Sequence, residues 1–285
     1  MKKILLLGDP VAHSRSPAMQ NAALEYLSFA ARYEARHTTA AELAATVAAL
    51  RDDDVLGANV TLPHKEAVLP LLDTIEPEAA QIGAVNTIYK GLEGELVGAN
   101  TDAPALLRDL AELGFAAQDR QVVVLGASGA ARAAIFTLVK AGAAQVLVAN
   151  RTLERAENLL ADLFLALTDE QGLLFNGQLP PALLAFALDD PELDEYVADA
   201  DLLVNATSLG WHGDETPLTD PVLSPDALVY DMVYRRTPLM RAAEMRGARA
   251  SDGLGMLLYQ GALAFEHWTG QAAPLDVMRR VLRDS

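Results

Sequence analysis

The chain has 285 residues, which is enough for two domains that each bury a core. Its formal net charge of −17 argues against a nucleic-acid partner, because phosphate binding requires a basic face. The lack of cysteine excludes disulfides, thiol nucleophiles and cysteine-based zinc sites, and no apolar run approaches the ~20 residues of a membrane-spanning helix. The composition therefore predicts a cytoplasmic globular protein with no membrane or nucleic-acid partner.

The first predicted strand covers residues 4–7, and an amphipathic helix follows the segment AHSRSP at 12–17. Ser16 before Pro17 predicts a helix N-cap with proline at the first helical position. Ser14 has no such capping role, and two hydroxyls beside a helix N-terminus suit a carboxylate. The residues predicted to form the core-facing stripe of this helix are Met19, Ala22, Ala23, Tyr26 and Leu27.

Polar residues follow the next predicted strand. Residues 40–50 predict an alanine-rich helix, and residues 55–60 predict a strand that continues into the segment NVTLPHK at 59–65. Polar residues at the end of a parallel strand lie where open α/β sheets bind ligands. Lys65 is therefore a candidate catalytic residue, although a solvated surface lysine is the alternative on spacing alone. Asn86 and Thr87 repeat the pattern of a polar pair beside an apolar strand.

The segment NTDAP at 100–104 precedes a predicted helix over residues 105–113, which ends at Gly114. On spacing alone, Asp102 is either the N-cap of this helix or a functional carboxylate. We expect the helix to form the hinge between two domains, because a second type of sequence pattern begins directly after it.

That pattern, over residues 121–152, is a strand, a glycine turn, a helix and a second strand, as in dinucleotide-binding βαβ units. The β-branched run 122–125 is the first strand, the helix ends at Gly142, and residues 145–149 form the second strand. Ser128 stands where the fingerprint has the glycine that lets the backbone approach the pyrophosphate. An ordinary βα turn that needs glycine for its backbone angles is the alternative interpretation.

The end of the second strand indicates which dinucleotide would bind. An NAD-binding unit commonly has Asp or Glu there, whereas this chain has Asn150 and Arg151, with Arg155 one helical turn further on. Guanidinium groups suit a 2′-phosphate, so the predicted cofactor is NADP(H). A solvated helix start is the alternative, but cations near a helix N-terminus oppose the helix dipole, and an anionic ligand would explain them.

The rest of the chain continues the alternation of strands and helices. An amphipathic helix is predicted to about residue 165, and residues 168–195 predict a weak strand and short helices. Strands are predicted over 201–205 and 227–233, with a Pro/Asp-rich loop to residue 225 between them. A helix over 237–247 and a final pair of helices after the segment DGLGM at 252–256 complete the pattern.

Together these motifs resemble the shikimate dehydrogenase family over most of the chain. The segments that carry the resemblance follow the family's order and spacing: AHSRSP, GANVTLPHKE, IGAVNT, NTD, VVVLGASGAARA, ANRT, LLVNATSLG, YDMVY and DGLGMLLYQ. The resemblance implies an oxidoreductase that reversibly reduces 3-dehydroshikimate to shikimate with NADPH, in chorismate and aromatic amino-acid biosynthesis. Ser128 and Ala103 replace glycines usual in the family, which puts cofactor affinity in question more than activity.

The resemblance also implies roles for individual residues. Lys65 and Asp102 are the expected catalytic pair, and no metal site is expected. The residues expected to contact substrate are Ser14, Ser16, Asn59, Thr61, Asn86, Tyr234 and Gln260, with the two serines and Tyr234 at its carboxylate. The residues expected to contact NADP are Gly126, Ala127, Ser128, Gly129, Ala130, Asn150, Arg151, Thr152, Arg155, Thr207, Met232 and Gly253.

The expected fold is α/β with two domains separated by a cleft. Residues 1–102 with 253–285 are expected to form the substrate-binding domain, and residues 103–252 a Rossmann-like NADP-binding domain. Lys65 and Asp102 are expected to face the nicotinamide, and the protein is expected to be a monomer or a homodimer. Two alternatives stay open: a quinate/shikimate dehydrogenase that uses NAD, and a non-catalytic NADPH-binding module on the same fold.

Overall fold

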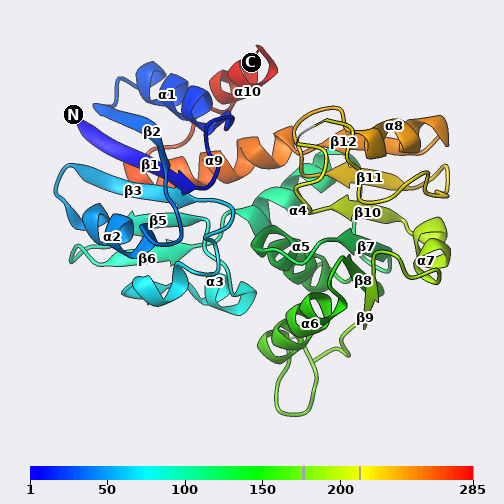
Figure 1. Cartoon of the computed structure of the whole chain (residues 1–285). Helices are drawn as coiled ribbons and strands as arrows, with labels where there is room; N and C mark the ends of the chain where they lie inside the picture. The colour runs from blue at the N-terminus through cyan, green and yellow to red at the C-terminus, as the bar shows by residue number, and fades with distance from the viewer. Residues whose placement is uncertain (175–176, 212, 285) are drawn as a thin grey trace. The chain divides into compact units, whose positions relative to one another are not determined.

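The computed structural model describes residues 1–174, 177–211 and 213–284 (Figure 1). Internal contacts divide the chain into two units, of which the first comprises Met1–Ala105 and Leu257–Ser285 and the second comprises Leu106–Met256. Each unit contains one six-stranded sheet with helices, so the predicted α/β class is confirmed. The unit boundaries lie within a few residues of the predicted domain boundaries at 102 and 253.

The sheet of the first unit is mixed, and its strand order is β2-β1-β3-β5-β6-β4. Its strands are β1 (Lys2–Gly8), β2 (Ala31–His37), β3 (Val55–Val60), β4 (Thr74–Ile75), β5 (Thr87–Lys90) and β6 (Leu96–Ala99). Strand β1 runs parallel to β2 and β3, whereas β5 is antiparallel to both β3 and β6. Asn59 at the end of β3 therefore pairs with Thr87 at the start of β5, which brings two polar segments together.

The helices of the first unit cover this sheet. They are α1 (Ser16–Tyr26), α2 (Leu43–Ala48), η1 (Ala49–Arg51), η2 (Leu69–Leu71), α3 (Pro77–Ile82) and α10 (Leu275–Asp284). Helices α4 (Asp102–Glu112) and α9 (Leu254–Thr269) each begin in one unit and continue into the other. Helix α1 packs on α10 and β2, while side chains of β1, β3, β5, β6, α2 and α3 form one buried apolar cluster.

Two predictions for α1 are wrong in detail. Ser16 is the first residue of the helix and not its N-cap. The Ser14 hydroxyl instead accepts a hydrogen bond of 3.2 Å from the main-chain N–H of Ser16. Tyr26 is 66% exposed, whereas Gln20 is buried. Gln20 is tolerated inside because its amide donates a hydrogen bond of 2.8 Å to the carbonyl of Gly261 on α9.

Three edge strands have no counterpart among the predicted elements. Strand β2 has the sequence ARYEARH, in which charged residues are as frequent as apolar ones, and only one of its residues is fully buried. Edge strands are commonly blunted with charge, so their hydrophobic pattern is weak. The others are β4, which has only two residues at the opposite edge of the same sheet, and β12 (Arg249–Asp252), at the edge of the second sheet. The predicted helix over 40–50 is also shorter, because α2 begins at Leu43.

The sheet of the second unit is fully parallel, in the order β12-β11-β10-β7-β8-β9. Its other strands are β7 (Gln121–Leu125), β8 (Gln145–Asn150), β9 (Ala182–Ala187), β10 (Leu202–Asn205) and β11 (Leu228–Asp231). The chain moves outward from β7 to β9 and then returns to β10 on the other side of β7. This is the doubly wound order of a dinucleotide-binding fold, in which ligands bind where the strand order reverses.

Helices cover both faces of this parallel sheet. They are α5 (Gly129–Lys140), α6 (Leu153–Leu167), α7 (Leu193–Asp199) and α8 (Pro238–Met245). One apolar cluster joins alternate residues of β7, β8, β10 and β11 to α7 and α8, while α5 and α6 pack against β7, β8 and β9 without sharing that cluster. Burial on both faces explains why these strands read as continuous apolar runs. The weak strand predicted within 168–195 is β9; residues 175–176 of that region and residue 212 of the predicted loop lie outside the described residues.

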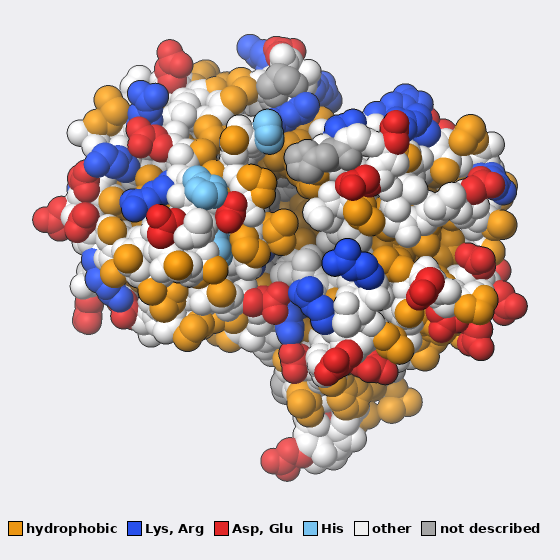
Figure 2. All heavy atoms as spheres, in the orientation of Figure 1, with side chains coloured by type: hydrophobic (Ala, Val, Ile, Leu, Met, Phe, Trp, Pro, Cys, Tyr) orange, Lys and Arg blue, Asp and Glu red, His pale blue; other side chains and the backbone are white. Residues whose placement is uncertain are grey.

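Within the described part of the chain, no helix is long and apolar enough to cross a membrane. The same residues contain no group of three or more His, Asp or Glu side chains arranged to hold a metal ion. Figure 2 shows acidic and basic side chains interspersed over the visible face, so the net charge of −17 does not gather into one acidic patch there.

Candidate functional site

Lys65 and Asp102 form a largely buried ion pair in the first unit. Lys65 Nζ lies 2.6 Å from Asp102 Oδ2, and the two side chains are 16% and 6% exposed. The loop after β3 carries Lys65, whose main-chain carbonyl accepts a hydrogen bond of 2.8 Å from the N–H of Val85. Asp102 is the first residue of α4. The fold thus brings together two predicted site residues that lie 37 positions apart in the chain.

Asn86 holds the second oxygen of the same carboxylate. Its Nδ2 donates to Asp102 Oδ1 at 2.8 Å and to Thr101 Oγ1 at 2.9 Å, and its Oδ1 accepts from the main-chain N–H of Thr101 at 2.8 Å. Asp102 therefore accepts from Lys65 on one oxygen and from Asn86 on the other, which fixes the plane of the carboxylate. Charge-assisted hydrogen bonds of this kind are among the stronger ones in proteins.

Asn100 caps α4, a role that the sequence analysis did not assign. Its Oδ1 accepts from the main-chain N–H groups of Asp102 and Ala103, at 3.0 and 3.1 Å, and its Nδ2 donates to the carbonyl of Ala84 at 2.9 Å. The cap leaves the Asp102 carboxylate available to Lys65 instead of its own helix. An Asn just before a helix is a recognised capping signal, so the segment NTD contained the information.

Asn59 is a predicted substrate contact whose amide nitrogen and oxygen already have hydrogen-bond partners within the protein. The residue is 4% exposed. Its Nδ2 donates to the carbonyl of Asn86 at 3.0 Å and to Thr87 Oγ1 at 3.1 Å, and its Oδ1 accepts from the Tyr33 hydroxyl at 2.8 Å. Both amide protons are therefore used within the protein, and only the oxygen retains capacity for a substrate hydroxyl.

The remaining predicted substrate contacts of the first unit come from three segments. Ser14 and Ser16 lie at the start of α1, and Thr61 directly follows β3. A Cβ added to Gly8 would lie 2.4 Å from the Thr61 methyl group, so the end of β1 requires glycine for this close approach. Gln260 lies on α9 and is nearly buried, with its Nε2 donating to a carbonyl one turn earlier in the helix.

Tyr234 belongs to the second unit and follows β11. Its ring meets Trp211 edge-on, with the ring centroids 4.4 Å apart. The predicted contact of Tyr234 with a substrate carboxylate stays a prediction.

The glycine turn after β7 lies at the point where the strand order reverses. Gly126 has a φ of +107°, which favours glycine, and an added Cβ would be crowded at 3.1 Å from the Ala206 carbonyl oxygen and from Thr207 Cγ2. The Ser128 hydroxyl donates to the Ala206 carbonyl at 3.1 Å and accepts from the N–H of Ala131 at 3.3 Å. Ser128 therefore caps α5, which explains how serine replaces the usual glycine.

A buried polar pair holds the neighbouring loop, and the sequence analysis missed it. Asn205 ends β10 and Asp231 ends β11, and the Asn205 Nδ2 donates to Asp231 Oδ1 at 2.9 Å. Asn205 Oδ1 accepts from both the N–H and the hydroxyl of Thr207, at 3.0 and 2.7 Å. Burial raises the pKa of Asp231, although hydrogen bonds from Thr237 and Val233 act against that rise. Polar residues that end apolar strands were the available signal.

Two further predicted cofactor contacts meet at the end of β11. A Cβ on Gly253 would lie 2.6 Å from the carbonyl oxygen of Met232, so glycine is required for the main chains to approach. Gly253 lies directly between β12 and α9. The fold therefore brings Met232 and Gly253 together within the second unit.

The predicted 2′-phosphate contacts follow β8. Asn150 donates from Nδ2 to the carbonyl of Thr152 at 2.8 Å, and Arg155 donates from Nη2 to the carbonyl of Ala127 at 3.4 Å. Arg151, Thr152 and Arg155 are all exposed. An exposed pair of guanidinium groups, a helix N-terminus and a glycine cradle fit the 2′-phosphate and pyrophosphate of NADP.

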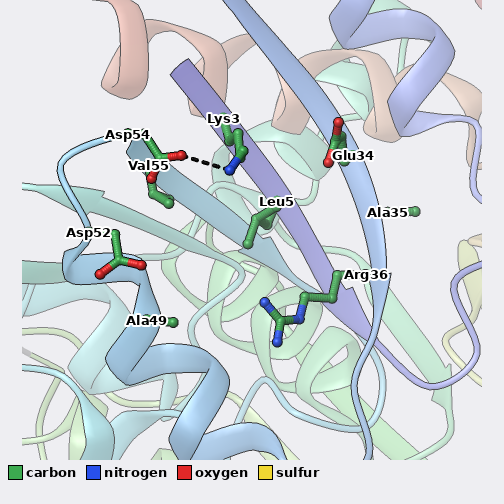
Figure 3. A pocket seen from close by; sticks show the side chains of 9 residues that line it. All are labelled: Lys3, Leu5, Glu34, Ala35, Arg36, Ala49, Asp52, Asp54 and Val55. Carbon is green, nitrogen blue, oxygen red and sulfur yellow. Dashed lines mark hydrogen bonds and ion pairs between the residues drawn. The ribbon is translucent and has the colours of Figure 1, made fainter. Parts of the chain in front are cut away.

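A surface hollow of about 330 Å³ in the first unit contains none of the predicted site residues. Its lining residues, shown in Figure 3, are Lys3, Leu5, Glu34, Ala35, Arg36, Ala49, Asp52, Asp54 and Val55. Lys3 and Asp54 form an ion pair of 2.7 Å on its wall, and the charged side chains around it are of both signs. This arrangement favours a solvated surface over a binding site for one class of ligand.

The second unit has a doubly wound sheet with a glycine turn at the point where the strand order reverses, and the first unit has a buried Lys–Asp pair. These two features together are typical of two-domain, dinucleotide-dependent oxidoreductases. Models of the shikimate dehydrogenase substrate binding domain, of shikimate/quinate 5-dehydrogenase and of the shikimate 5′-dehydrogenase C-terminal domain match residues 6–88, 109–171 and 253–283. The chain belongs to the shikimate dehydrogenase family.

Individual relatives agree with these family models. The NADP(+) shikimate dehydrogenase of Moorella thermoacetica is 45% identical, over 99% of this chain and 92% of its own length. The structure of Thermus thermophilus shikimate 5-dehydrogenase with NADP(H) and shikimate is 39% identical, with a TM-score of 0.83 and coverage of 100% and 99%. Quinate dehydrogenase from Corynebacterium glutamicum with NAD is 30% identical, with a TM-score of 0.85 and coverage of 100% and 99%.

Proposed function

We propose that this protein catalyses the reversible NADPH-dependent reduction of 3-dehydroshikimate to shikimate, a step of chorismate and aromatic amino-acid biosynthesis. The observation that carries the proposal is the ion pair of 2.6 Å between Lys65 and Asp102, held in place by Asn86. The pair lies in the unit whose residues 6–88 match the substrate binding domain of the family.

The chemistry of ketone reduction requires a proton donor beside the reacting oxygen. NADPH, when bound, supplies the hydride, and negative charge develops on the carbonyl oxygen as the C–H bond forms. The Lys65 ammonium donates the proton that neutralises this oxygen, and in the reverse direction the lysine accepts it. Asp102 orients the ammonium and has lone pairs left to accept a hydrogen bond from a ring hydroxyl.

We further propose that the first unit binds the substrate. The substrate carboxylate would be held by the hydroxyls of Ser14 and Ser16 at the start of α1, with Tyr234 as a further donor. The residues that would hydrogen-bond to the ring hydroxyls are Asn59, Thr61, Asn86, Asp102 and Gln260. A polyol needs donors and acceptors in this number, because each buried hydroxyl left unpaired costs binding energy.

The second unit would bind NADP. The pyrophosphate would lie against Gly126, Ala127, Ser128, Gly129 and Ala130 at the N-terminus of α5, where main-chain N–H groups and the helix dipole favour an anion. The residues around the 2′-phosphate would be Asn150, Arg151, Thr152 and Arg155. Those nearer the nicotinamide would be Thr207, Met232 and Gly253.

The test is turnover of purified protein with shikimate and with quinate, each offered NADP and NAD, followed by the absorbance of the reduced nicotinamide. Turnover confined mainly to shikimate with NADP is the expected result. Preferred turnover of quinate with NAD would instead indicate a quinate dehydrogenase, like the Corynebacterium glutamicum relative. Silence in all four pairings, from protein that still binds NADPH, would favour a non-catalytic NADPH-binding module.

Two further proposals concern the location of the protein in the cell and its oligomeric state. We propose a cytoplasmic location, which the lack of cysteine favours, and cell fractionation tests it. We also propose a monomer or homodimer, and sedimentation equilibrium distinguishes these from larger assemblies.

A further inference from the structure

A continuous series of buried hydrogen bonds leads from the edge of the first sheet to the Lys65–Asp102 pair. It begins at Tyr33 on the edge strand β2, whose side chain reaches past β1 to β3. The Tyr33 hydroxyl donates to Asn59 Oδ1 at 2.8 Å, and the two residues are 1% and 4% exposed. Tyr33 is therefore linked to the candidate site although it lies outside it.

The series continues through the paired ends of β3 and β5. Asn59 Nδ2 donates to the carbonyl oxygen of Asn86 at 3.0 Å and to the hydroxyl of Thr87 at 3.1 Å. The Thr87 hydroxyl in turn donates to Asn86 Oδ1 at 3.1 Å. Asn59 therefore restrains Asn86 twice, once through its main chain and once, by way of Thr87, through its side chain.

Asn86 transmits this restraint to the reacting groups. Its Nδ2 donates to Asp102 Oδ1, and Asp102 Oδ2 accepts from Lys65. Asn86, Thr87 and Asp102 are all buried, so water has little access to replace a bond that is lost. In such surroundings a hydrogen-bonded network acts as a unit, and an unpaired polar atom is costly.

We propose that Tyr33 is a positioning residue for the reaction: through Asn59 and Asn86 it holds the Asp102 carboxylate, and so the Lys65 ammonium, in the orientation that proton transfer requires. This inference rests on the proposed function. Without the Tyr33 hydroxyl, the buried Asn59 Oδ1 loses its donor and the amide loses the contact that sets its rotation. The ring itself packs against Trp268, with centroids 5.9 Å apart, and a phenylalanine retains that contact.

The first test compares Tyr33→Phe with the unchanged protein in shikimate oxidation by NADP. We expect kcat to fall about three- to tenfold, the effect of one hydrogen bond that matters in the transition state. The KM for NADP should be unchanged, because the altered network lies wholly in the first unit. An unchanged kcat would overturn the inference while leaving the proposed function in place; an inactive parent protein would overturn both.

Tyr89→Phe is the matched control for general destabilisation. Tyr89 lies in the same sheet, its hydroxyl donates to Glu76 Oε1 at 2.7 Å, and its ring stacks on His267 of α9 with centroids 4.5 Å apart. The Tyr89→Phe variant therefore loses one tyrosine hydrogen bond outside the network and should retain its kcat. Equal falls in kcat for the Tyr33 and Tyr89 variants, in step with their melting temperatures, would show a stability effect and overturn the inference.

A double-mutant cycle tests the route. If Tyr33 acts through Asn59, then Tyr33→Phe should reduce kcat much less in an Asn59→Ala background than in the parent protein. Thr87→Val, which removes one hydroxyl and preserves shape, provides a second background if Asn59→Ala does not fold. Fully additive effects on kcat in the folded background would overturn the proposed route.

Discussion

The Ser128 hydroxyl donates a hydrogen bond of 3.1 Å to the carbonyl of Ala206, and so joins the loops that follow β7 and β10. These two strands are neighbours in the sheet, and the strand order reverses between them. The bond therefore ties together two loops at the point of the sheet where doubly wound folds bind their ligands. Serine at this position joins the two loops by a side-chain contact that glycine could not make.

Gly126→Ala should weaken NADP binding, because the new Cβ would crowd Ala206 and Thr207 at 3.1 Å and strain a backbone with φ of +107°. We expect the KM for NADP to rise about tenfold or more, and the free energy of unfolding to fall by about 1–3 kcal/mol. Steady-state kinetics and urea unfolding measure the two effects.

Gly114→Ala separates backbone strain from crowding. Gly114 also has a positive φ, of +74°, but an added Cβ would meet nothing within 4 Å. Its variant should lose about 1 kcal/mol of stability and keep its KM for NADP. An equal rise in KM for both variants would contradict the proposed role of the Gly126 turn.

Lys65→Met should abolish most turnover and leave cofactor binding intact. Removal of a general acid–base group typically costs about 10²- to 10⁴-fold in rate. The measurement is kcat for shikimate oxidation beside the Kd for NADPH from fluorescence titration. Lys3→Met is the control, since Lys3 also pairs with an aspartate, Asp54 at 2.7 Å, but on the exposed surface. Turnover near the parent level in Lys65→Met would exclude Lys65 as the proton donor.

Arg151→Ala should reduce the preference for NADP. Arg151 is exposed at the end of β8 and makes no ion pair with the residues the structure describes, so its charge is available to a 2′-phosphate. We expect the KM for NADP to rise about tenfold while the KM for NAD is unchanged. Arg120→Ala is the control, because Arg120 directly precedes β7 and pairs with Asp201. This variant should change neither the KM for NADP nor the KM for NAD. Parallel rises for NAD and NADP would refute the phosphate contact.

Asp109 gives the second unit a predictable pH dependence. Burial raises the pKa of this carboxyl above 3.8, although the Tyr230 hydroxyl, which donates to Asp109 Oδ2 at 2.5 Å, lowers it in part. The folded state thus holds a proton that the unfolded state releases near pH 3.8. This contribution to stability is complete below that pH and is lost as pH rises through the folded pKa.

Asp109→Asn should therefore lose less stability than the parent protein as pH rises from about 4 through the folded pKa of Asp109. Tyr230→Phe should have the opposite effect, because it removes the bond that lowers the pKa of Asp109 and so moves the loss to higher pH. Urea unfolding at a series of pH values measures both differences. Identical pH dependence in all three proteins would rule out Asp109 as the titrating group.

Local sequence was sufficient for the elements whose stabilising contacts lie close along the chain. The strand–turn–helix–strand unit around Gly126 was found because apolar runs, a glycine with positive φ and the helix end at Gly142 fall within about thirty residues, the span of one βαβ unit. The family motifs likewise indicated Lys65 and Asp102. The catalytic role of these two residues remains a prediction that the experiments above test.

Tertiary structure decided the elements and contacts that depend on distant partners. Strands β2 and β12 lie at sheet edges, where weak apolar patterning does not identify a strand. Gln20 is buried because Gly261, far along the chain, supplies its acceptor. Neither feature can be read from a local window of sequence.

The sequence by itself determined the α/β class, the dinucleotide-binding unit and the polar segments at its strand ends, because each follows from local periodicity and turn chemistry. Only the tertiary structure decided how those polar residues pair. Asn59 meets Thr87 through the register of two antiparallel strands, and Lys65 meets Asp102 across 37 positions of the chain. Hydrogen bonds are short and directional, so their partners are set by three-dimensional register, which no local pattern encodes.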